Sequence, residues 1–135
     1  MADEQIEAYR DLRAWQEAMT VAADCYRITQ LFPREEAFGM TSQIRRSAAS
    51  VAANIAEGWG RDGTGSFVQF LKVPQGSLKE LETHLLLSER VGLSSTSVVR
   101  FSLGAMISEE CFALTSARFS ARGKDGTARS LTTDH

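Results

Sequence analysis

SQIRRSAASVAANIAEG, running from Ser42 to Gly58, is the stretch that decides the fold of this chain. It consists almost wholly of small residues, and its large apolar side chains, Ile44, Val51 and Ile55, recur at the spacing of one helix face. Because the distance between packed helices depends on the side chains between them, small residues allow a close approach. We therefore expect a central, tightly packed helix in an all-α domain.

Three more helical patterns flank this segment. Before it, apolar residues at alternating spacings of three and four indicate one face of a first helix that ends near Leu31: Leu12, Trp15, Met19, Ala22, Tyr26 and Thr29. After it, the pattern predicts a third helix over about 66–91 and a fourth that ends near Arg122. Short connections between four helices favour an antiparallel up-down-up-down four-helix bundle over residues 1–122. Residues 123–135 are polar and aperiodic, which is typical of a disordered tail.

Capping and turn residues mark the ends of these helices. Pro33 disfavours helical geometry at the residue before it and can open a single helical turn after it. Thr41 or Ser42 is expected to cap the second helix and Ser66 the third, because a hydroxyl oxygen can accept a hydrogen bond from a free backbone N–H group. Gly92 is expected to end the third helix.

Pro74 is expected to lie inside the third helix, where it removes a backbone hydrogen bond and clashes with the preceding turn. The apolar pattern continues on both sides of this proline. We therefore expect a kink near residues 70–75 and not the end of the helix.

The third and fourth helices carry more apolar residues than one buried face needs. Leu85–Leu87 cover much of the circumference of the third helix, and Phe101, Ala105, Phe112 and Phe119 cluster opposite another apolar group on the fourth. These residues either pack under loops and lie scattered at the surface, or they form a second interface in a homo-oligomer. Under the second interpretation, the three phenylalanines are oligomer residues.

No catalytic, metal or cofactor site emerges from the pattern of residues. Residues 58–63 match G-x-G-x-x-G, but the dinucleotide-binding motif follows a strand, and here a helix precedes it. A di-iron bundle needs Glu-x-x-His, and His84 has Leu81 at the required position. Cys25 and Cys111 fit the role of small apolar residues. We expect no enzyme, with a hydrolase that relies on carboxylates alone as the remaining enzymatic alternative.

Two adjacent arginines lie in the first turns of the small-residue helix. Neither Arg45 nor Arg46 has a carboxylate three or four residues away. They either pair with acidic groups of another helix or subunit, or they form a phosphate-binding patch with Arg34 and Arg61. The second alternative makes these four arginines the candidate nucleic-acid-binding residues.

Asn54 is a lone amide among alanines, and burying it is costly unless it is paired. It is expected to form an interhelical hydrogen bond that fixes the helix register, with a ligand contact as the alternative. Glu57 is expected to pair with Arg61 at i,i+4 spacing, a structural role.

The overall charge argues against a general attraction to polyanions. With 15 basic and 17 acidic residues the formal net charge is −2, so binding to nucleic acid requires a local patch. The acidic N-terminus does not resemble a signal peptide, and no apolar run is long enough to span a bilayer. We expect a cytoplasmic protein with no membrane partner.

Several short motifs occur together between residues 9 and 93: Asp11-Leu12-x-x-Trp15-Gln16, Phe32-Pro33-x-Glu35, Ser42-Gln43-Ile44-Arg45-Arg46, Asn54-Ile55-Ala56-Glu57-Gly58, Phe70-Leu71 and Gly76-Ser77-Leu78-x-Glu80-Leu81-Glu82. In this combination the chain resembles the four-helix-bundle family of proteins encoded by intervening sequences of 23S ribosomal RNA genes. It departs from the family at Pro74, where a small, helix-compatible residue is usual.

The resemblance implies an antiparallel bundle that assembles as a homopentamer and has no known enzymatic activity. Accessory proteins of diversity-generating retroelements share the fold, bind nucleic acid and work with a reverse transcriptase, although they look more basic than this chain. The expected function is therefore that of a non-enzymatic, oligomeric accessory protein that binds RNA or DNA. The alternative is a protein-interaction scaffold without affinity for nucleic acid.

Overall fold

The computed structural model describes residues 7–60, 64–93, 99 and 103–104. It contains two 3-10 turns and four helices in the order η1 (Tyr9–Asp11), α1 (Arg13–Thr29), η2 (Arg34–Glu36), α2 (Met40–Trp59), α3 (Thr64–Phe70) and α4 (Lys72–Arg90). The prediction of an all-α fold is confirmed for this part of the chain, which contains no strand. The predicted fourth helix lies outside the described residues, except for Val99, Leu103 and Gly104, which are helical.

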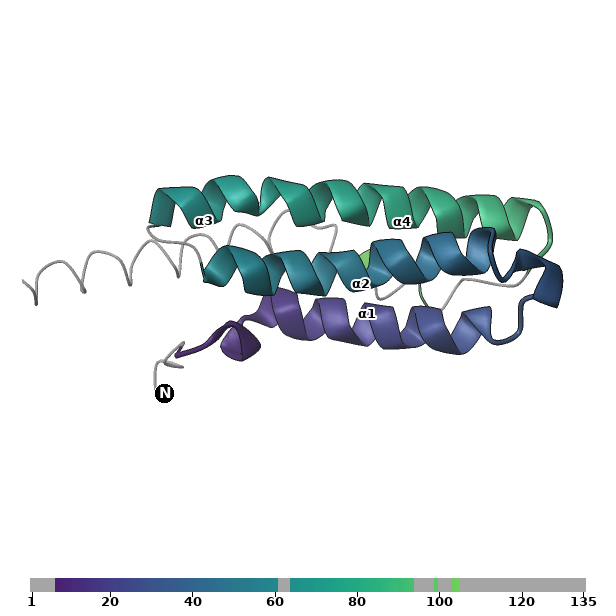
Figure 1. The fold of residues 1–135 in the computed structure, drawn as a ribbon, viewed down its shortest axis with the longest axis horizontal. Coiled ribbons are helices and arrows are strands. Elements are labelled where there is room, and N and C mark those ends of the chain that lie inside the picture. Colours follow the sequence, from purple (N-terminus) through teal and green to yellow (C-terminus); the bar gives the residue numbers. More distant parts are fainter. Residues whose placement is uncertain (1–6, 61–63, 94–98, 100–102, 105–135) are drawn as a thin grey trace, which may run out of the picture.

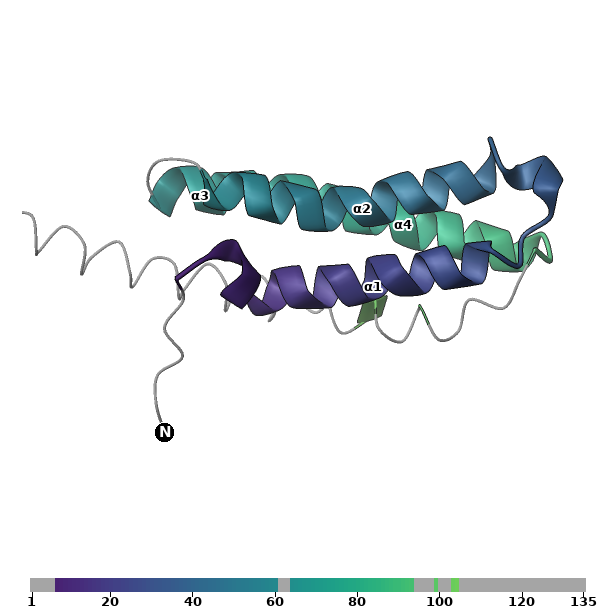
Figure 2. The same cartoon turned by 60° about the horizontal axis from the view of Figure 1, so that its bottom comes forward.

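Helix α2 is the central helix of the described structure. It packs against α1 and α4, whereas the backbones of α1 and α4 lie farther apart from each other (Figures 1 and 2). Most of the buried residues of α2 are small. The full set of its buried residues is Ile44, Ser47, Ala48, Val51, Ala52, Ile55 and Gly58. Because these small side chains allow two neighbouring helices to come close, the segment takes the central position that its composition predicts.

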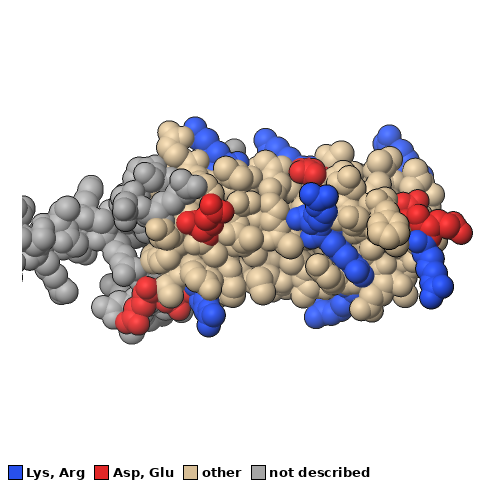
Figure 3. All heavy atoms as spheres, in the orientation of Figure 1, with Lys and Arg blue, Asp and Glu red and all other residues tan. Residues whose placement is uncertain are grey.

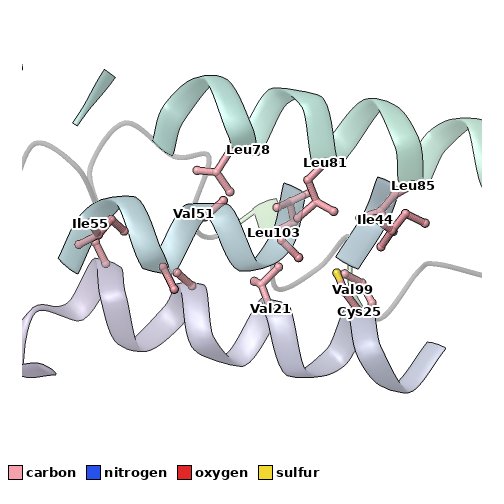
Figure 4. Packing of buried hydrophobic residues seen from close by; sticks show 14 of the residues in the cluster. Val21, Cys25, Ile44, Val51, Ile55, Leu78, Leu81, Leu85, Val99 and Leu103 are labelled. Carbon is pink, nitrogen blue, oxygen red and sulfur yellow. The ribbon is translucent and has the colours of Figure 1, made fainter. Parts of the chain in front are cut away.

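The core lies between the three long helices and includes two residues from beyond α4. Figure 4 shows Val99 and Leu103 among the side chains of α1, α2 and α4. Both side chains are fully buried. Since they are four positions apart, they lie on the same side of a helical turn. This part of the sequence therefore supplies core residues, as the bundle requires.

The buried side of α1 differs from the apolar stripe seen in the sequence. The structure buries Ala14, Ala18, Val21 and Cys25, while Met19 and Tyr26 remain 47% exposed. Alanines fit where two backbones approach closely, and larger side chains do not. As a result, α1 has an apolar stripe on the bundle surface as well as one in the core.

The predicted caps of the second and third helices are wrong. Helix α2 begins at Met40, after Gly39, and the carboxylate Oε2 of Glu36 accepts a hydrogen bond of 3.0 Å from the backbone N–H of Met40. Neither Thr41 nor Ser42 is the cap, because α2 begins before them and both lie inside the helix. Ser66 is not a cap either, since α3 begins two residues earlier.

The predicted third helix is interrupted at one residue, Leu71, and its two parts, α3 and α4, follow one another along the same side of the bundle (Figure 1). Pro74 is buried as the third residue of α4, and the Leu71 N–H donates to the Phe67 carbonyl oxygen at 3.0 Å across the interruption. The first turn of a helix has N–H groups without intrahelical acceptors, so a proline is tolerated there.

Helix α4 ends as predicted. Gly92 has φ +78°, a value that favours glycine. Its N–H donates to the carbonyl oxygen of Glu89 at 3.1 Å, and the N–H of Leu93 donates to that of Ser88 at 2.9 Å. This pair of bonds is the Schellman motif, which satisfies the last carbonyl groups of the helix.

Candidate interaction surface

Arg45 joins α2 to α1 and is not a free cationic arm. Its Nε donates a hydrogen bond of 2.9 Å to the hydroxyl of buried Thr29, and that hydroxyl donates to the carbonyl oxygen of Cys25 at 2.7 Å. The guanidinium carbon lies 4.7 Å from the centre of the Tyr26 ring, a cation–π arrangement. One of the four predicted nucleic-acid-binding arginines therefore serves to hold two helices together.

The other predicted arginines are not brought together with Arg45 into one patch. Arg46 is exposed on the second turn of α2, and Arg34 is exposed on η2. Within the described part of the chain neither side chain makes an ion pair or hydrogen bond. Arg61 lies outside the described residues, so the complete patch remains a prediction.

Asn54 acts through Ser50 and does not bridge helices directly. Its amide Nδ2 donates to the backbone carbonyl and to the hydroxyl of Ser50, both at 2.8 Å. The hydroxyl of Ser50 in turn lies 3.1 Å from that of Ser77 on α4. The link between helices is thus a pair of serines, which the sequence reasoning missed. In the sequence, a serine one turn before Asn54 in an alanine-rich helix could have indicated this link.

Four further residues are predicted to have structural roles: Glu57, Phe101, Phe112 and Phe119. Glu57 is exposed on α2, and its expected partner Arg61 is outside the described residues. Phe101, Phe112 and Phe119 also lie outside them. Their role at a subunit interface stays a prediction.

Exposed residues of the two neighbouring helices α1 and α2 make up what we call the outer face: Met19, Tyr26, Arg46, Ala49 and Ala53. The stacking of Arg45 on Tyr26 places the two helices side by side here. On α2 the three residues are spaced i, i+3 and i+7, which is one side of a helix. Figure 3 shows one side of the bundle, on which tan surface without Lys, Arg, Asp or Glu dominates around a few basic and acidic groups.

Titratable groups in the described structure form no evident reactive centre. No three His, Cys, Asp or Glu residues there are grouped to hold a metal ion. Burial raises the pKa of the Cys25 thiol to about 12, with Asp24 a smaller cause, so the thiol is neutral at physiological pH. His84 Nε2 lies 3.4 Å from the Glu80 carboxylate on the exposed side of α4.

None of the described helices is long and apolar enough to cross a membrane.

The chain matches a known protein family. The family model for the 23S rRNA-intervening sequence protein matches residues 10–114, which is most of the chain and extends beyond the motifs between residues 9 and 93. No curated protein matches the chain.

Proposed function

The chain belongs to the 23S rRNA-intervening sequence protein family, and on this premise we propose that it acts as a non-enzymatic subunit of a homo-oligomer. The observation that carries the proposal is the outer face. Met19 and Tyr26 expose about half of their surface beside exposed alanines of α2, while the buried side of α1 is built from other residues. A helix with an apolar stripe left over after its core is complete is typical of an interface between subunits.

Light scattering of the purified protein tests this proposal. We expect a molecular mass several times 14.8 kDa, and five times that mass for the pentamer implied by the family resemblance. Met19→Glu should lower the mass because it places a charge in the apolar interface. Thr83→Glu, at an exposed position of α4, is the matched control and should leave the mass unchanged. A wild-type protein that is monomeric at micromolar concentration contradicts the proposal.

Binding of RNA or DNA is the second candidate function. The favouring observation is that Arg34 and Arg46 are exposed and without ion pairs in the described part of the chain. In an oligomer each contact would be repeated, so weak single contacts combine. Such binding falls with salt, because each phosphate that is neutralised releases counterions. A reverse transcriptase as partner, and the cytoplasmic location, remain predictions.

Fluorescence anisotropy with labelled RNA and DNA at about 50 and about 200 mM salt tests this second candidate. Arg34→Glu and Arg46→Glu should each weaken binding, whereas Lys79→Glu, a change of the same charge on exposed α4, should not. Arg45 is left unchanged because it holds α1 against α2. No binding by the wild-type protein at the lower salt concentration favours a scaffold without nucleic-acid affinity.

A further inference from the structure

Phe38 is a fully exposed aromatic side chain at one end of the bundle. Its exposed fraction is 100%, and Leu31 in the same connection between α1 and α2 is 76% exposed. The backbone around Phe38 is well held: the N–H of Gly39 donates to the carbonyl oxygen of Glu36 at 3.0 Å, and the Glu36 carboxylate caps Met40. Phe38 therefore projects from an ordered turn, and leaving an aromatic ring in water is unfavourable.

Phe38 cannot be covered by the outer face of its own copy. It precedes the first residue of α2, and Ala49 and Ala53 lie about 14 and 20 Å further along that helix at 1.5 Å per residue. Because α2 is a rigid element packed on both sides, the distance does not close. Contact between the two surfaces thus requires a second copy.

One pair of charges on the two surfaces is complementary, although the exposed cation Arg34 precedes Glu35 in the sequence. Glu35 is an exposed carboxylate three residues before Phe38, and Arg46 is an exposed cation at the edge of the outer face. Within the described part of the chain each lacks an ionic partner. The small side chains of Ala49 and Ala53 leave room beside Arg46 for a ring to pack. The aromatic ring and the carboxylate of one surface therefore have an apolar group and a cation as counterparts on the other.

We propose that Phe38 of one copy packs on the outer face of the next copy, with Glu35 paired to Arg46 across the contact. The proposal rests on the self-association proposed above and identifies the residues that make it. The two surfaces differ, so the contact is heterologous: the Phe38 end of each copy binds the outer face of the next copy. Repetition of such a contact closes a ring or extends a chain.

A charge exchange tests the contact. Glu35→Arg and Arg46→Glu should each lower the mass measured by light scattering, and the double variant should restore it, because the ion pair is re-formed with its charges reversed. Phe38→Ala should raise the dissociation constant of the assembly by about tenfold or more, as expected for the loss of a buried aromatic ring. Val73→Ala, at a 48% exposed position of α4, is the control and should leave assembly unchanged. Circular dichroism should show intact helices in all variants.

The outcomes separate this contact from the broader proposals. A monomeric wild type overturns self-association and this contact together. If the wild type is an oligomer that Met19→Glu disrupts and Phe38→Ala does not, only the contact at Phe38 is overturned. If Arg46→Glu leaves the mass unchanged but abolishes nucleic-acid binding, Arg46 is a phosphate contact and the pairing with Glu35 is wrong.

Discussion

Replacing Gly58 by alanine should destabilise the protein, although the same change elsewhere in a helix should stabilise it. A Cβ atom at Gly58 would lie 2.6 Å from Cδ1 of Phe70 and 3.4 Å from Cδ2 of Phe67. The first distance is shorter than a non-bonded carbon–carbon contact allows, so the Phe70 ring or the helix must move. Overpacking of this kind costs about 1–3 kcal/mol, against a gain of up to about 1 kcal/mol from the better helix propensity of alanine.

Gly76→Ala is the matched control. Gly76 lies inside α4, and a Cβ atom there meets nothing within 4 Å. Only the propensity gain remains, so the variant should be stabilised by about 0.5–1 kcal/mol. The difference in free energy of unfolding between the two variants, about 1–3 kcal/mol, measures the clash at Gly58.

Urea denaturation followed by circular dichroism gives these free energies, at one protein concentration because association shifts apparent stability. In a Phe70→Ala background the clash is removed, so Gly58→Ala should there be neutral or stabilising. Equal effects of Gly58→Ala and Gly76→Ala, or a cost at Gly58 that persists without the Phe70 ring, would contradict the proposed clash.

Three further variants test other parts of the structure. Pro74→Ala should change the free energy of unfolding by less than about 1 kcal/mol, since Pro74 lies in the first turn of α4; a gain near 3 kcal/mol would place it in a helix interior. Arg45→Ala should cost about 1–2 kcal/mol through loss of the Thr29 hydrogen bond and the Tyr26 stacking, and Lys79→Ala less than about 0.5; equal costs would contradict the proposed clamp. In a Cys111→Ser background, Cys25 should react with a thiol reagent only on unfolding. Because its pKa is raised from 9.0 to about 12, the unfolded chain loses the proton first, and stability should fall as pH rises through this range; no fall would show that the thiol is not buried.

The repeating pattern of helical residues could be predicted from the sequence because it depends on local spacing. Small residues from Ser42 to Gly58 predicted the central helix α2. Gly92 predicted the end of α4, since a left-handed backbone conformation favours glycine whatever packs around it. The family motifs led to the correct family. Of the candidate arginines, the sequence located exposed Arg34 and Arg46, but spacing alone did not distinguish them from Arg45.

Tertiary structure decided which side of each helix is buried and which polar groups meet. Spacing gives the period of α1 but not its rotation, and the approach of α2 selects Ala14 and Ala18 for the core over Met19 and Tyr26. The cap from Glu36, the stacking of Arg45 on Tyr26 and the Ser50–Ser77 bond all join different elements. Gly58 and Gly76 both lie in helices of the structure, and the position of Phe70 makes alanine costly at Gly58. These features depend on distances between segments, which packing sets and local sequence does not.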